Sequence, residues 1–90
     1  MEKNYRVKAR VETIQSTTRL TDEKYGGWMA VNTGSAACEV LGISLLPTEG
    51  LNFLDAVPAG SFWTQPIDIV INPGGAIRIV RMIYEEIKED

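Results

Sequence analysis

The sequence predicts an all-β fold, either a small antiparallel β-sandwich or a jelly-roll-like barrel, that closes with a C-terminal β-hairpin. Short apolar runs alternate with turn residues about every eight to twelve positions, which is the spacing of such folds. The strongest signal lies in residues 66–84, where two β-branched runs flank Pro73-Gly74-Gly75. Because the chain has only 90 residues, we expect a single domain over residues 1–90 with a modest core that self-association can supplement.

The two β-branched runs are predicted to pair with each other across a three-residue loop, Pro73-Gly74-Gly75. This register places Ile71 opposite Ile77 and Ile69 opposite Ile79, whereas a slip of one residue scatters the isoleucines over both faces. The last glycine of the loop is expected in the left-handed region. The resulting isoleucine face comprises Ile67, Ile69, Ile71, Ile77, Ile79 and Ile83.

Charged residues interrupt this closing segment at three positions. Arg81 falls on the isoleucine face, either as an end-of-sheet arginine whose stem covers apolar surface or as an inter-subunit ion pair or ligand contact. Asp68 and Arg78 are expected to pair on the polar face of the hairpin. Asp55 and Asp68 are the carboxylates inside the apolar C-terminal body, and general acid–base catalysis would need both of them in one cleft.

The amino-terminal segment alternates with period two over residues 5–13, which predicts a half-buried edge strand. We expect an inward row of Tyr5, Val7, Ala9 and Val11 and an outward row of Arg6, Lys8, Arg10 and Glu12. The charges around this strand are basic, and those of residues 85–90 are acidic. Either both ends are solvated, or the basic and acidic ends of neighbouring copies meet.

The middle of the chain alternates strand and turn signals. Residues 15–27 are polar and irregular, which predicts a loop or arm that is mobile or reaches over a neighbouring copy; Thr21 can cap a helical turn there. On this interpretation, deletion of residues 16–24 leaves the domain folded and weakens assembly. Further strands are predicted at 28–32, 36–41, 43–46 and 51–53, with a bend at Gly42. A turn is expected at 47–50 and a loop at 54–61, after which Phe62-Trp63 returns to the core.

Composition excludes several classes of function. A net charge of −3 and a pI near 4.9 argue against a basic nucleic-acid-binding surface. The chain has no histidine and one cysteine, Cys38, so zinc, Ser-His and Cys-His sites are excluded or lack their usual residues. Cys38 is expected to be a buried, inert side chain. No apolar run is long enough to span a membrane, and no signal peptide is expected. We therefore predict a protein without enzymatic activity or cofactor.

The closing strand is apolar on both faces, which predicts cover on both sides. Its second face carries Val80, Met82 and Tyr84, so we expect these three side chains in a contact between chains, with Arg78 and Asp68 at the rim. Lysine at positions 80 and 82 should then yield a folded monomer. An alternative is a small carbohydrate- or ligand-binding domain whose aromatic platform comprises Trp28, Trp63, Tyr5, Tyr25 and Tyr84.

A series of turn and packing motifs resembles small β-proteins encoded among the structural genes of tailed bacteriophages, notably those infecting gut Bacteroidetes. The motifs span roughly residues 5–84 and comprise Tyr25-Gly26-Gly27-Trp28, Val31-Asn32-Thr33-Gly34, Val40-Leu41-Gly42, Leu46-Pro47-Thr48-Glu49-Gly50, Phe62-Trp63, Pro66-Ile67 and Pro73-Gly74-Gly75-Ala76. The resemblance implies a virion component, such as a head decoration, head-fibre or tail-associated module made in the host cytoplasm. Its implied partners are other copies of itself, for example in a trimer, and other virion proteins.

Overall fold

The computed structural model describes residues 5–21, 25–58 and 61–87. These residues form eight strands in two four-stranded antiparallel sheets and no helix, so the predicted all-β sandwich class is confirmed. Residues 22–24, which include most of the helical turn expected after Thr21, lie outside the described residues.

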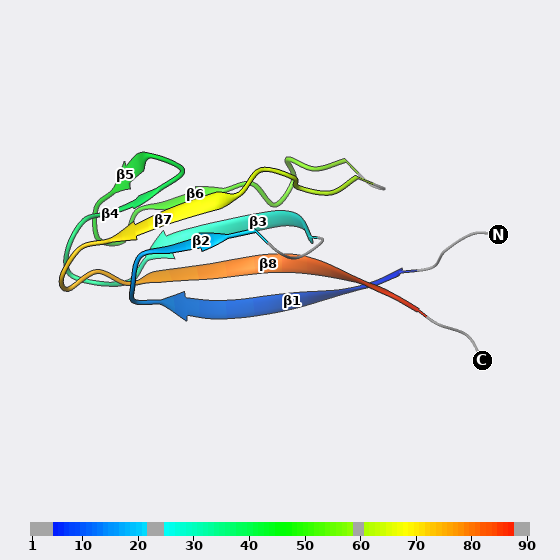
Figure 1. The fold of residues 1–90 in the computed structure, drawn as a ribbon, viewed down its shortest axis with the longest axis horizontal. Helices are drawn as coiled ribbons and strands as arrows, with labels where there is room; N and C mark the ends of the chain where they lie inside the picture. The colour runs from blue at the N-terminus through cyan, green and yellow to red at the C-terminus, as the bar shows by residue number, and fades with distance from the viewer. Residues whose placement is uncertain (1–4, 22–24, 59–60, 88–90) are drawn as a thin grey trace.

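The two sheets are named here after their central strands. The β8 sheet has the order β1 (Tyr5–Ile14), β8 (Ile77–Glu86), β3 (Tyr25–Asn32) and β6 (Gly50–Asn52). The β7 sheet has the order β2 (Thr18–Leu20), β7 (Ile67–Ile71), β4 (Cys38–Val40) and β5 (Ile43–Leu45). Figure 1 shows β1 and β8 side by side as a long ribbon that extends beyond the shorter strands.

The core lies between the sheets, and the isoleucines of β7 and β8 are its largest group of side chains. Ile67 and Ile69 project from β7 and Ile77 and Ile79 from β8, and all four are fully buried. Burial of each such side chain contributes about 1.5–3 kcal/mol relative to exposure. Trp28 and Ala30 of β3, also fully buried, complete the layer beside β8.

The predicted C-terminal hairpin is wrong, although both of its strands exist. β7 pairs with β2 and β4, and β8 pairs with β1 and β3, so the expected Ile71–Ile77 and Ile69–Ile79 pairs do not form. The chain instead crosses from one sheet to the other. The predicted isoleucine face is nevertheless buried, apart from the half-buried Ile71, because its members face each other across the two sheets.

The turn at residues 72–75 explains this crossing. The Gly75 N–H donates to the carbonyl oxygen of Asn72 at 2.8 Å, Pro73 occupies the second position, and Gly74 has a φ of +89°. These features are typical of a type II turn. Type II turns splay the strands that they join, whereas tight hairpins prefer the mirror-image types. The left-handed residue is therefore Gly74 and not the expected Gly75.

The inward and outward rows of β1 are the reverse of those predicted. Val7 and Val11 are 49% and 59% exposed, whereas Ile14 is buried and Glu12 is half-buried. The register with β8 imposes this orientation, because Ile14 pairs with the buried Ile77 and residues that are directly opposite share a face. The prediction of an edge strand is confirmed.

Part of the predicted polar loop at 15–27 is regular structure. β2 pairs with β7 and places Leu20 opposite Ile67, where Leu20 packs against the core. β3 begins at Tyr25, three residues before the predicted start of the strand. Deletion of residues 16–24 would remove an edge strand of the β7 sheet, so the expectation that the domain folds without them no longer follows.

The remaining strands and turns agree with prediction to within a few residues. Gly42 does mark a turn: Leu41 and Gly42 both have positive φ, 54° and 75°, and they join Val40 to Ile43 in the β4–β5 hairpin. Two positive φ values are typical of the type I′ turn that hairpins prefer.

Two glycines offer a matched test of this fold. A Cβ on Gly27 would overlap the backbone of Leu54, whereas a Cβ on Gly42 has no neighbour within 4 Å. We expect Gly27→Ala to cost at least about 3 kcal/mol because backbone must move, and Gly42→Ala to cost about 1–2 kcal/mol because only its positive φ is strained. Urea denaturation measures both, and equal losses would contradict the packing of Gly27.

Candidate functional site

The outer face of the β8 sheet carries a continuous apolar surface. Cross-strand pairing joins its side chains: Val7 lies opposite Tyr84, Ala9 opposite Met82, and Val11 opposite Val80. Val80 is also paired with Met29 on β3. We call this surface the apolar face; it comprises Tyr5, Val7, Ala9 and Val11 of β1, Met29 and Val31 of β3, and Val80, Met82 and Tyr84 of β8.

Charge is almost absent from the apolar face. The described outward side chains of β1, β8 and β3 include a single charged group, Arg78, which is paired with Thr13 on one side and Val31 on the other. Arg78 therefore marks one end of the face. The other end is aromatic. The Phe62 ring meets the rings of Tyr84 and Tyr5 edge-on, with centroid distances of 5.5 Å and 6.3 Å.

The predicted interface residues divide between the two sheets. Val80, Met82 and Tyr84 lie together on the apolar face, with Arg78 at its end. Asp68 lies on β7 in the other sheet, where its carboxylate pairs with Arg19 Nε at 3.5 Å, so the predicted Asp68–Arg78 pair is wrong. Asp68 cannot share a rim with Arg78, because the core separates the two sheets.

Six residues of the apolar face are absent from the interface that the sequence predicted. They were hidden because β1 was assigned the opposite orientation and because the partners of β8 were unknown. The sequence did indicate the orientation of β1. The apolar Ile14 continues the row of alternate residues that carries the charges, which places that row on the core side. The missed residues are Tyr5, Val7, Ala9, Val11, Met29 and Val31.

Arg81 is held inside the chain. Its side chain is on the core side of β8, the residue is 3% exposed, and its Nη2 donates to the Glu12 carboxylate across the β1–β8 pair. Its guanidinium also lies over the Tyr25 ring, 5.4 Å from the centroid. The end-of-sheet interpretation is wrong, because Arg81 lies within β8 and is buried, and both of these contacts are made within one chain.

The basic and acidic ends also meet within one chain. Lys8 Nζ lies 2.7 Å from a Glu85 carboxylate oxygen, and Arg6 Nε lies 3.9 Å from the other oxygen. The hydrogen bond from Lys8 lowers the pKa of Glu85, and the charges of Lys8 and Arg6 act in the same direction. All three side chains are solvent-exposed, so the contribution to stability is small.

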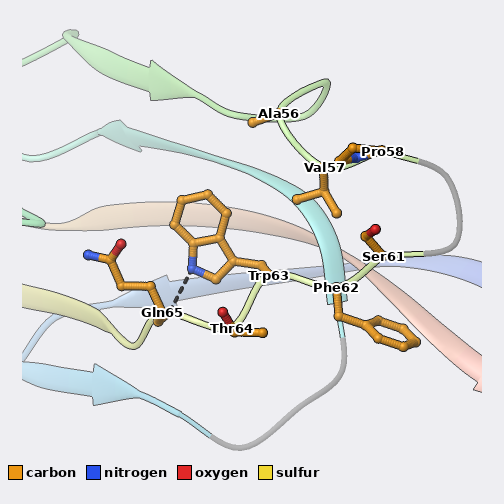
Figure 2. Close-up of a pocket in the computed structure, with 8 residues that line it drawn as sticks. All are labelled: Ala56, Val57, Pro58, Ser61, Phe62, Trp63, Thr64 and Gln65. Carbon is orange, nitrogen blue, oxygen red and sulfur yellow. Dashed lines mark hydrogen bonds between the residues drawn. The ribbon is translucent and has the colours of Figure 1, made fainter.

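A shallow hollow of about 270 Å³ lies beside the connection between β6 and β7. Figure 2 shows its lining, with Trp63 and Phe62 projecting to opposite sides of the segment. The Trp63 indole N–H donates to the carbonyl oxygen of Gln65 at 2.6 Å. The Trp63 ring packs against the rings of Trp28 and Phe53, with centroid distances of 5.4 Å and 5.5 Å. The volume is slightly below the range typical of ligand pockets.

The aromatic platform expected for sugar binding is not assembled. Trp28 is fully buried and Tyr25 nearly so, whereas Tyr5 and Tyr84 lie at the end of the apolar face. Trp63 is the one member of the predicted set that lines the hollow.

Other chemical groups lie apart from one another. Cys38 is fully buried, as predicted, and Asp55 and Asp68 are exposed on separate elements. Among residues 5–21, 25–58 and 61–87, no three His, Cys, Asp or Glu side chains gather at a metal-binding distance. In the same ranges no helix is long and apolar enough to cross a membrane.

Comparison with known proteins assigns neither a family nor a function to the chain. No protein-family model matches the chain, and neither a curated protein nor a solved structure does. Because one β-sandwich architecture serves many unrelated functions, the function has to be argued from the surfaces described above.

The Arg81–Glu12 pair yields a stability prediction. Glu12→Ala leaves a buried guanidinium without its carboxylate, and we expect a loss of about 2 kcal/mol, below the range for fully buried pairs because Glu12 is partly exposed. The double variant Glu12→Ala/Arg81→Met should lose less than Glu12→Ala alone, because no unpaired charge remains. A double-mutant cycle in urea measures the coupling, and additive losses would contradict it.

Tyr25 yields a pH prediction. Burial raises the pKa of Tyr25 above its usual value near 10, while the Arg81 charge partly opposes the shift. The neutral phenol is favoured in the folded state, so its contribution to stability is complete below the pKa of the unfolded chain and is lost as pH rises through the folded pKa. The difference between the ultraviolet titrations of the wild type and Tyr25→Phe isolates this phenol, and a midpoint at or below 10 would contradict its burial.

Proposed function

We propose that this protein is a non-enzymatic structural assembly module of a bacteriophage particle, such as a head decoration, head-fibre or tail-associated protein. The observation that carries the proposal is the apolar face. Nine side chains of three neighbouring strands form it, and one of them, Val11, is 59% exposed. Contiguous apolar surface on this scale usually marks a site of protein association.

The position of the apolar face supports association rather than catalysis. It lies on the outer side of the longest strands, β1 and β8, and not in a cleft. Extended strands hold its side chains in fixed positions, so a partner meets a surface that needs little ordering on binding. A flat, rigid apolar surface suits permanent contacts between subunits, which resemble a domain core cut in half.

The resemblance to small β-proteins of tailed phages supplies the biological setting. Particles of that kind are built from many copies of small modules, and a compact domain with one association face is suited to that use. Its proposed partners are other copies of itself and other virion proteins. The carbohydrate-binding alternative has less support, because Trp28 and Tyr25 are in the core and the hollow beside Trp63 is small.

The proposal predicts that charges placed on the apolar face abolish assembly. The variant Val80→Lys/Met82→Lys should remain folded and sediment as a monomer, because lysine ammonium groups cannot be buried in an apolar contact without a large desolvation cost. Sedimentation velocity and circular dichroism measure the two properties.

A control with the same chemistry lies on the other sheet. Val70 is 38% exposed on β7, whose outer side lies across the core from the apolar face. We expect Val70→Lys to leave the sedimentation coefficient of the wild-type assembly unchanged. Unfolding of the double variant would place Val80 and Met82 in the core of the chain, and an unchanged oligomer would place the contact elsewhere.

A further inference from the structure

The geometry points to a second copy of this chain as the partner of the apolar face. We infer that two copies pack apolar face to apolar face about a two-fold axis that runs across the strands. This inference rests on the proposed function, which requires association through the face, and adds the identity and orientation of the partner.

The distribution of charge favours a second copy over a charged partner. Any group that covers Val80 and Met82 loses its water. Among the described outward side chains only Arg78, at the end of the face beside Val80, could serve as its countercharge. A second copy brings an uncharged surface of equal size to the same place. Self-complementarity of this kind is what a two-fold contact requires.

The free edge of β1 is a poorer route to self-association. Its inward row carries Arg6, Lys8 and Arg10 in alternation. In an antiparallel β1–β1 pairing that uses most of the strand and keeps the faces aligned, at least two of these cations lie directly opposite each other. Like charges in that position destabilise a sheet, and such rows are a common protection of edge strands.

The area of the face is sufficient for a stable dimer. Three strands spaced about 4.8 Å apart and each about 25–30 Å long give a footprint of roughly 400 Å² per copy. The accessible area of a corrugated face is larger than its footprint, and both copies bury the same area. Together with the polar rim, the total accessible area buried by the two copies therefore reaches about 1,000 Å², which is the lower bound of a specific interface.

Arg78 selects the direction of the axis. β8 is the middle strand of the three that form the face. An axis along β8 would bring the two Arg78 side chains together across a sheet separation of about 10 Å. An axis across the strands near position 81 instead separates them along the strands by about 20 Å. Each Arg78 then lies over the aromatic end of its partner, near Tyr84, where a guanidinium can stack on a ring.

Cross-linking through introduced cysteines tests this arrangement. Met82→Cys and Arg78→Cys lie on the same strand and the same face, and the native Cys38 is fully buried, so the wild type serves as the unreactive control. With a short bis-maleimide linker, we expect Met82→Cys to form a covalent dimer about ten-fold faster than Arg78→Cys, because only position 82 lies near the axis. Sedimentation velocity on both variants before cross-linking reports whether they associate.

The outcomes separate the inference from the proposed function. Comparable cross-linking at position 78 would place the axis along the strands and overturn the inference. Association without cross-linking at either position would indicate a head-to-tail contact, such as a trimeric ring, and would overturn the two-fold arrangement while leaving the proposed function intact. A wild type that stays monomeric at high concentration would overturn a second copy as the partner, and the proposed function would then rest on other virion proteins as partners.

Discussion

The structure depends on the division of one isoleucine-rich segment between two sheets. Ile67 and Ile69 on β7 and Ile77 and Ile79 on β8 are fully buried because each pair covers the other across the core. In a local hairpin all four would lie on one face of one sheet and would need other residues to cover them. Division also makes both strands central, with a hydrogen-bonded neighbour on each side, so their backbone groups are satisfied without the β7–β8 ladder.

The turn and a buried amide stabilise this division. The Pro73-Gly74 turn directs the chain out of the β7 sheet, and backbone bonds from Thr33 and Ser35 to the carbonyl oxygens of Ala76 and Gly74 hold the crossing against the turn after β3. Asn32, at the end of β3, is fully buried. Its amide donates to the carbonyl oxygens of Ala36 and Leu45, and its side-chain oxygen accepts from the Gly34 N–H, so all its polar atoms are used in linking the two sheets.

The apolar face is a consequence of the same division. Once the isoleucines of β8 face the core, the alternate residues Val80 and Met82 must face outward, together with the β1 and β3 residues in register with them. A sandwich of two sheets has no third layer to cover them. Arg81, on the core side between Ile79 and Ile83, is accommodated by Glu12 and Tyr25 and is thereby removed from the surface.

Local sequence determined the class of fold, most of the strands and the alternation within them. The two apolar faces of residues 77–84 were visible without a structure, and so was the row of Val80, Met82 and Tyr84 on the face opposite the isoleucines. Only the tertiary structure decided which strands pair, because pairing depends on contacts between residues far apart in the chain. It therefore corrected the hairpin, the orientation of β1 and the partners of Asp68 and Arg81. The type II signature of Pro73-Gly74 was a local clue to the first correction, but the burial of the isoleucines between two sheets, a property of the whole chain, determined the outcome.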